Sequence, residues 1–149
     1  RLKATSITTA VELSYFPLSL LSHLRESHPD KATDSQFIAS RGDAAAEAYS
    51  DIIKLGGSHD EAEEVASQTL YAGLHFSPYR TIVNILWNEF TEEIDPALAE
   101  GLAMELLPRL SVVIEKYTLS DDFADSQEYS LLYTELTGAI QTLLEDGVQ

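Results

Sequence analysis

The stretch over residues 70–90 constrains the fold more than any other part of the chain. It combines a dense run of apolar residues with the only tryptophan, Trp87. Ser77 followed by Pro78 is typical of a helix start, because serine caps exposed backbone N–H groups and proline suits the first helical position, where no donor is needed. The stretch therefore predicts a helix over residues 78–90.

This predicted helix is apolar on more than one side. Its apolar residues recur at a spacing of three to four, which gives one continuous stripe, but Ile85 and Trp87 lie outside it. A surface helix needs a single apolar stripe, whereas a helix packed by neighbours on several sides needs more. We therefore expect residues 78–90 to form the central helix of the fold. The stripe consists of Tyr79, Ile82, Val83, Leu86 and Phe90.

Similar start and stop signals predict five further helices. Each start carries a serine or aspartate that can cap the first turn, and Ser58 with Glu61 has the spacing of a capping box. Pro108 lies inside the fifth predicted helix and removes a backbone donor, so we expect a kink or break near Leu107. These five helices cover residues 14–26, 34–55, 58–72, 95–117 and 126–145.

Six helices with short connections predict an all-α fold, a compact multihelical bundle of about six helices around the central helix 78–90. No β-hairpin signal or internal repeat occurs. A chain of 149 residues is long enough to close one core. We expect a single helical domain over residues 14–149, preceded by a mobile or weakly ordered tail over residues 1–13.

The same spacing predicts which side chains face the core. The first predicted helix would turn Leu18, Leu21 and Leu24 inward, and the inward face of the fifth would begin at Leu98. The last predicted helix has the cleanest stripe in the chain. It consists of Tyr129, Leu132, Tyr133, Leu136, Ile140 and Leu143.

Negative charge is the most unusual overall property of the chain. Nine Lys and Arg residues stand against 25 Asp and Glu, and residues 58–149 hold three basic and 18 acidic side chains. Direct binding to nucleic acid or to an anionic membrane needs clustered lysine and arginine, so we expect neither. Two interpretations of the acidic surface remain: a solvated surface that serves solubility, or a surface for a basic protein partner.

The sequence lacks membrane and export signals as well as cysteine, although the lack of cysteine does not fix the compartment. No run approaches the length of a membrane span, and none has the layout of a signal peptide. The absence of cysteine excludes a disulfide scaffold, zinc–thiolate sites and cysteine catalysis. We expect a cytoplasmic protein, and no feature indicates a homo-oligomer.

No arrangement of residues predicts a metal, a cofactor or a catalytic group. Glu-x-x-His and His-Glu-x-x-His motifs are absent, and His59 with Glu63 lies in an exposed acidic first turn. The aspartates of the loop over residues 118–126 lack the order of an EF-hand, and helix capping is the expected role for them. The tripeptide Arg41-Gly42-Asp43 falls mid-helix, where a binding loop could not present it.

A polar strip on the central helix is the best candidate for contact with a ligand or partner. Arg80, Asn84 and Asn88 recur every four residues, opposite much of the apolar face. The strip either faces solvent or satisfies hydrogen bonds of a partly buried helix, or else it lines a groove beside aromatic residues. The candidate residues are Tyr71, His75, Arg80, Asn84, Trp87 and Asn88.

Four blocks together resemble a known family. They are LSLLSHLRESHP (18–29), SRGDAAAEAY (40–49), GLHFSPYRTIVNILWNEF (73–90) and SDDFADSQEYSLLYTELTGAI (120–140). The chain resembles an uncharacterised family of small all-helical proteins from Bacteroidetes, a domain of unknown function often encoded near conjugative elements. The resemblance implies a helical fold, a bacterial cytoplasmic setting and a link to mobile genetic elements. It carries over no catalytic or binding residue, and residues 1–13 fall outside it.

Two classes of function follow from these observations. The first, which we favour, is a non-enzymatic acidic interaction or accessory protein, one version of which mimics DNA toward a nucleic-acid-binding protein. The second is a small-ligand-binding protein or enzyme with an interhelical pocket near Tyr71, His75, Arg80 and Trp87. A deep cavity that contains those groups would favour the second class, and a convex acidic face the first.

Overall fold

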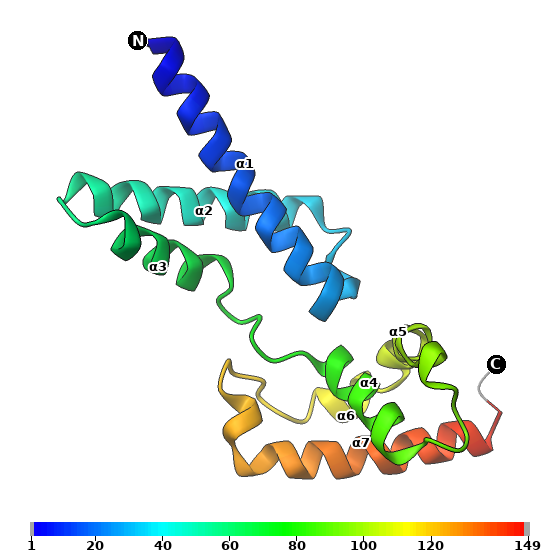
Figure 1. Cartoon of the computed structure of the whole chain (residues 1–149). Coiled ribbons are helices and arrows are strands. Elements are labelled where there is room, and N and C mark those ends of the chain that lie inside the picture. The colour runs from blue at the N-terminus through cyan, green and yellow to red at the C-terminus, as the bar shows by residue number, and fades with distance from the viewer. Residues whose placement is uncertain (1, 148–149) are drawn as a thin grey trace. The chain divides into compact units, whose positions relative to one another are not determined.

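The computed structural model describes the backbone of residues 2–147 and the side chains of residues 15–147. Within that range the chain forms seven α-helices and three short 3-10 helices and no β-strand (Figure 1). The prediction of an all-α fold is therefore confirmed. The seventh α-helix arises because the fifth predicted helix is interrupted.

The helices form two compact units, Arg1–Ala72 and Gly73–Gln149, which we call the N-terminal and C-terminal units. The sequence predicted one domain over residues 14–149 and did not anticipate this division. The boundary falls inside the apolar stretch 70–90, so only the part of that stretch from residue 73 onward belongs to the unit built around the predicted central helix. The N-terminal unit contains α1 (Leu2–Ser27), η1 (Pro29–Lys31), α2 (Ser35–Lys54) and α3 (His59–Leu70). The C-terminal unit contains α4 (Pro78–Glu89), η2 (Pro96–Leu98), α5 (Ala99–Arg109), α6 (Ser111–Ile114), η3 (Phe123–Asp125) and α7 (Gln127–Glu145).

Helix α1 starts earlier than the sequence predicted. The sequence predicted a tail over residues 1–13 and a helix from residue 14, whereas α1 begins at Leu2. Pro17 lies inside this helix. Residue 1 lies outside the described residues, as do the side chains up to residue 14. Proline inside a helix removes one hydrogen bond, but its ring here packs against α2: a Cβ added at Gly42 would lie 2.8 Å from the Cγ of Pro17. Glycine thus lets the two helices approach closely.

The buried face of α1 differs from the predicted one. Phe16, Leu20 and Leu24 are buried, whereas Leu18, which the sequence placed inward, is 65% exposed. The prediction set the helix register from a start near Pro17. In the structure the contact with α2 selects the face instead, and the buried residues recur at a spacing of four.

Helices α2 and α3 are capped as predicted. The Asp34 carboxylate accepts a hydrogen bond from the backbone N–H of Phe37, and Ser58 and Glu61 form the reciprocal capping box. The Arg41 guanidinium reaches the C-terminal end of α3 and donates to the backbone carbonyls of Leu70 and Ala72 at 3.0 and 2.7 Å. A cation at this end satisfies carbonyls that have no partner within the helix and complements its dipole.

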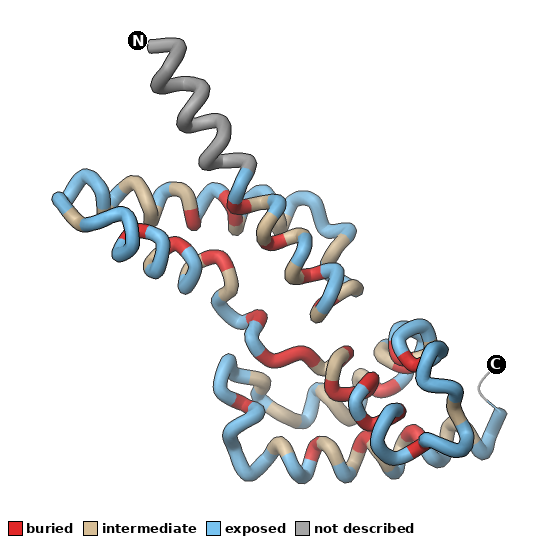
Figure 2. The backbone as a smooth tube through the Cα atoms, viewed as in Figure 1, coloured by how far each residue is buried: buried red, intermediate tan, exposed pale blue. Residues whose placement is uncertain are grey.

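Helix α4 is the centre of the C-terminal unit. Ser77 accepts a hydrogen bond from the backbone N–H of Arg80, and Pro78 occupies the first helical position, as predicted. The helix is buried on more than one side (Figure 2), because Thr81 and Ile85 are buried as well as the apolar stripe. Helices α5 and α7 both pack against it. The buried residues of α4 are Tyr79, Thr81, Ile82, Val83, Ile85 and Leu86.

The fifth predicted helix, over residues 95–117, is interrupted at Leu110, close to the break expected near Leu107. Its first turn is the 3-10 helix η2, and Leu98 at the end of this turn is 63% exposed, so the prediction that Leu98 points inward is wrong. A 3-10 turn advances about 120° per residue rather than about 100°, since it has three residues per turn. The inward face therefore starts one residue later, at Ala99, which is fully buried.

One aspartate of the predicted capping loop holds the start of the C-terminal unit. The Asp121 carboxylate accepts hydrogen bonds from the backbone N–H groups of Gly73 and His75 at 2.9 and 3.1 Å. Ser126 precedes α7 as predicted, but its hydroxyl donates to the carbonyl of Phe123 and makes no cap hydrogen bond. The loop aspartate thus fastens a segment distant in sequence rather than a neighbouring helix.

The burial of α4 predicts an asymmetric response to mutation. Leu86→Ala, at a residue 1% exposed, should lower the free energy of unfolding of the C-terminal unit by about 2–5 kcal/mol through lost burial and a cavity. Asn84→Ala, on the exposed side of the same helix, should change it by less than about 0.5 kcal/mol. Urea denaturation followed by the fluorescence of Trp87, the single tryptophan, reports on the unit in which this residue lies. Equal costs would contradict the orientation of α4.

The close contact of α1 with α2 predicts a destabilising alanine. Gly42→Ala should cost about 1–3 kcal/mol, because the new methyl group meets the Pro17 ring and the helices must move apart. Gly138→Ala is the matched helical control: nothing lies within 4 Å of its added Cβ, so it should stabilise by about 0.5–1 kcal/mol. Thermal unfolding followed by helical circular dichroism measures both, and a stabilising Gly42→Ala would disprove the contact.

Candidate functional site

Tyr71 is the only candidate residue in the N-terminal unit. Its hydroxyl lies 2.8 Å from the Ser19 hydroxyl, and its ring packs edge-on against His23 with 5.1 Å between centroids. These contacts join the end of α3 to α1. Tyr71 therefore has a structural role within its own unit.

His75 lies in the segment that leads into α4, and its side chain is 54% exposed. Its Nδ1 is 3.5 Å from the carboxylate of Asp121, which also accepts the backbone N–H of His75. An exposed contact of this kind contributes little to stability. The contacts position the segment before α4.

Arg80 and Trp87 fasten α4 to the elements that follow it. The Arg80 Nη1 lies 2.8 Å from the Glu100 carboxylate, and its guanidinium lies over the Tyr79 and Trp87 rings, 5.8 and 5.6 Å from their centroids. The Trp87 indole N–H donates to the carbonyl of Pro96 at 3.1 Å. Burial raises the pKa of Tyr79, and the negative charge of Glu100 adds to this effect.

The two asparagines of the polar strip differ in environment. Both are exposed, but the Asn88 amide also donates to the Tyr133 hydroxyl at 3.4 Å, and that hydroxyl donates to Glu89 at 2.9 Å. Burial is the main cause of the raised pKa of Tyr133. Asn84 and Asn88 thus both face solvent, while Arg80 and Asn88 also contact neighbouring helices, so the strip combines an exposed surface with contacts between helices.

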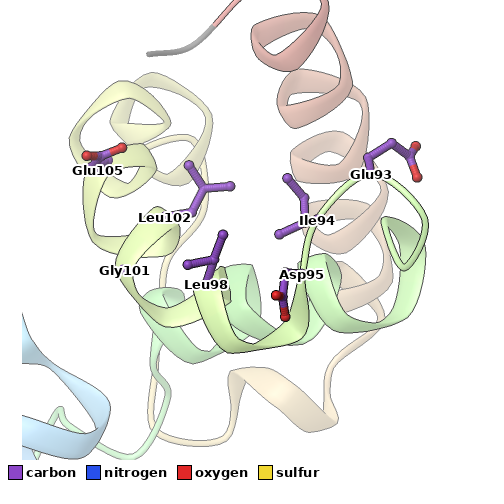
Figure 3. A pocket seen from close by; sticks show the side chains of 7 residues that line it. All are labelled: Glu93, Ile94, Asp95, Leu98, Gly101, Leu102 and Glu105. Atoms are coloured by element: carbon purple, nitrogen blue, oxygen red, sulfur yellow. The ribbon is translucent and has the colours of Figure 1, made fainter.

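A pocket of about 370 Å³ lies elsewhere in the C-terminal unit, between the loop after α4 and helix α5 (Figure 3). The side chains of Ile94, Leu98 and Leu102 point toward its interior, and acidic residues lie at its edge, with the carboxylates of Glu93 and Asp95 turned outward. Gly101 leaves the wall open, since nothing lies within 4 Å of an added Cβ. The lining residues are Glu93, Ile94, Asp95, Leu98, Gly101, Leu102 and Glu105.

Sequence reasoning missed this pocket because it placed Leu98 in the core. A signal was nevertheless present: Leu98 and Leu102 are four residues apart, and Glu93, Asp95 and Glu105 flank them. An apolar pair surrounded by carboxylates is typical of a solvent-facing surface rather than of a core. The 3-10 turn before α5 decides whether Leu98 faces the core or solvent, and the spacing of apolar residues does not reveal the register of that turn.

The C-terminal unit carries most of the negative charge. It holds three basic and 14 acidic residues, a net formal charge of −11. Lys116 pairs with Glu135 and, together with the Tyr117 hydroxyl, lowers the pKa of that carboxyl. Glu93 and Glu105 form no such ion pair among the described residues. The pocket edge is therefore a site of uncompensated negative charge.

The acidic groups do not converge on a point. In the described part of the chain, no group of three or more His, Asp or Glu residues is placed to hold a metal ion. None of the helices described combines the length and apolar character needed to cross a lipid bilayer. The arrangement can bind cations that are spread over a surface, beside an apolar floor.

Comparison with protein families decides where the chain belongs. A family model described as Domain of unknown function (DUF1896) matches residues 8–148. The chain belongs to this family. The resemblance to an uncharacterised all-helical family is confirmed, although the DUF1896 match begins at residue 8 and so includes residues that the resemblance left out.

A solved structure supports the fold of this DUF1896 chain. The crystal structure of protein PG0816 from Porphyromonas gingivalis is 47% identical in sequence, covers 93% of this chain and 95% of its own, and superimposes with a TM-score of 0.90. No curated protein matches the chain. A domain of unknown function transfers no activity and no site residue, so the function has to be argued from the residues described above.

The contacts of Arg80 predict a measurable structural role. Arg80→Ala should lower the free energy of unfolding of the C-terminal unit by about 1 kcal/mol, since it removes the pair with Glu100 and the stacking on Trp87. Arg80→Lys should keep only part of the stabilisation that Arg80 provides, because lysine lacks the planar guanidinium. Urea denaturation followed by Trp87 fluorescence checks both, with Asn84→Ala as control. An Arg80→Ala variant as stable as Asn84→Ala would show that Arg80 is merely solvated.

Proposed function

We propose that the chain is a non-enzymatic interaction or accessory protein that uses its acidic C-terminal unit to bind a basic partner protein. The net charge of −11 on residues 73–149 carries this proposal. Complementary charge steers association and suppresses wrong partners. The setting we propose is the bacterial cytoplasm, in connection with mobile genetic elements, as the family resemblance implied.

A nucleic-acid-binding protein is one class of partner that would present such a basic surface. Proteins that neutralise phosphates do so with clustered lysine and arginine. An acidic chain that occupies those side chains acts as a mimic of DNA. This version of the proposal makes the captured partner unable to bind nucleic acid while the complex persists.

The small-ligand or enzyme alternative has less support. It needs an interhelical pocket near Tyr71, His75, Arg80 and Trp87. Each of these side chains has a structural contact within its own unit, and Tyr71 belongs to a different unit from the other three. The pocket beside α5 is lined by other residues.

Salt separates an acidic binding surface from a merely solubilising one. Raising sodium chloride from very low to about 0.15 M shortens the Debye length to about 8 Å and screens self-repulsion, so the thermal midpoint of the chain should rise. The same change in salt should lower the affinity of the chain for a basic partner protein, because salt also screens the attraction between them. The measurements are thermal unfolding by circular dichroism and pull-down from the native host, identified by mass spectrometry, at both salt concentrations.

The control for this experiment is a charge-reduced N-terminal unit. The triple variant Asp43→Asn, Glu47→Gln, Asp51→Asn removes three exposed carboxylates from α2 and should leave partner capture unchanged. A basic protein captured at low salt and lost at high salt supports the proposal. Capture that is indifferent to salt would refute it and assign the acidic face to solubility alone.

A further inference from the structure

The floor of the pocket beside α5 is formed by Ile94, Leu98 and Leu102, and it is partly exposed to solvent. Ile94 and Leu102 are partly buried and pack against the core of the C-terminal unit, whereas Leu98 is 63% exposed. Leu98 and Leu102 lie one helical turn apart and point into the same space (Figure 3). Covering a large apolar side chain with a partner removes its surface from water and favours association. The floor therefore suits an apolar side chain from outside.

The edge of the pocket specifies the charge of what enters. Glu93 and Glu105 have no ion-pair partner among the described residues, and Asp95 uses one carboxylate oxygen to accept the N–H of Ala97. The basic residue nearest to Glu105 in the sequence is Arg109, one helical turn later. In the described structure these two side chains form no ion pair within 4 Å. Cationic groups on either side of an apolar anchor match this edge.

We infer that this pocket binds a short basic, amphipathic segment of the partner protein, with one large apolar side chain on the floor and lysine or arginine at the acidic edge. This inference rests on the proposed function and locates it. The volume of about 370 Å³ is small, near the lower end of the roughly 300–1,000 Å³ of small-molecule pockets, and fits such an anchor.

Other occupants fit the pocket less well. A metal ion needs convergent ligands, and the described residues offer no such group. An anionic metabolite would meet three carboxylates at the edge. A second copy of the chain carries a net charge of −16 and would be repelled at low ionic strength. Charge complementarity therefore selects a basic segment.

The test uses the full chain and a fluorescein-labelled peptide composed of leucine and lysine in an amphipathic helical pattern. Leu98→Ser should weaken its binding about tenfold, because the exposed apolar floor is lost. The double variant Glu93→Gln, Glu105→Gln should weaken it about fivefold through lost attraction at the edge. Fluorescence anisotropy at low ionic strength measures the dissociation constants.

Matched variants on other elements control for effects of overall charge and for nonspecific hydrophobic binding of the peptide. Leu131→Ser removes an apolar side chain of similar exposure, 61%, from α7, and the double variant Glu115→Gln, Glu128→Gln removes two exposed carboxylates. Both should change binding by less than about twofold if the pocket is the site. Circular dichroism confirms folding, and Leu98→Met, which keeps an apolar floor, should bind as the natural chain does.

Two further peptides test the chemistry of the occupant. A peptide with serine in place of leucine keeps the charge and should bind about tenfold more weakly, and one with glutamate in place of lysine should not bind. Pocket variants that bind like the natural chain, or controls that lose as much, would overturn the pocket assignment. If a basic host protein is still captured in a salt-dependent manner, the proposed function survives that failure. If neither the peptide nor a basic host protein binds, both are wrong.

Discussion

The burial of α4 on more than one side is the interaction on which the C-terminal unit depends. Ile82, Val83 and Ile85 are fully buried although they do not share one face, and α5 and α7 supply the covering surfaces. Polar groups on the buried sides of such a helix need partners within the protein. The Thr81 hydroxyl donates to the carbonyl of Ser77, and no buried side-chain nitrogen or oxygen in the described residues lacks a partner. Of the predicted polar strip, Arg80 pairs with Glu100 and Asn88 contacts Tyr133, while Asn84 and Asn88 both lie on the exposed side of the helix.

The N-terminal unit is stabilised by a different kind of packing. Where α4 is covered by large aliphatic and aromatic side chains, α2 and α3 pack against each other and carry the fully buried alanines Ala45, Ala62 and Ala66. Small side chains allow backbones to approach closely but bury less apolar surface per residue, and larger residues such as Phe16 and Leu70 supply the rest. The capping of α3 by Arg41 adds charge-assisted hydrogen bonds. The two units thus have cores of unlike composition.

The sequence predicted correctly those helix starts that depend only on residues close together in the chain. Ser77–Pro78, the Ser58–Glu61 box and Asp34 each depend on neighbours within three residues, and the structure confirms all of them. The faces of α1 and of the turn before α5 depend on which helix packs against them and on a 3-10 register, so Leu18 and Leu98 were placed wrongly. The pocket escaped prediction for the same reason, since it exists only because Leu98 turns outward. The sequence does end a predicted helix at residue 72, where Gly73 follows with a positive φ, but a helix end alone does not say that two separate units meet there.

The bond from Asp121 to the segment before α4 also bears on how the chain is made. Gly73 and His75 are separated from Asp121 by 48 and 46 positions, so during synthesis their N–H groups stay hydrated until the loop that holds them has emerged. The N-terminal unit, by contrast, is complete in sequence once residue 72 has been made. Domains generally fold as units in the order of synthesis, and long-range contacts form late. The N-terminal unit can therefore fold while α4, with its large apolar surface, still awaits its partners, and this interval is when the nascent chain is most exposed to aggregation.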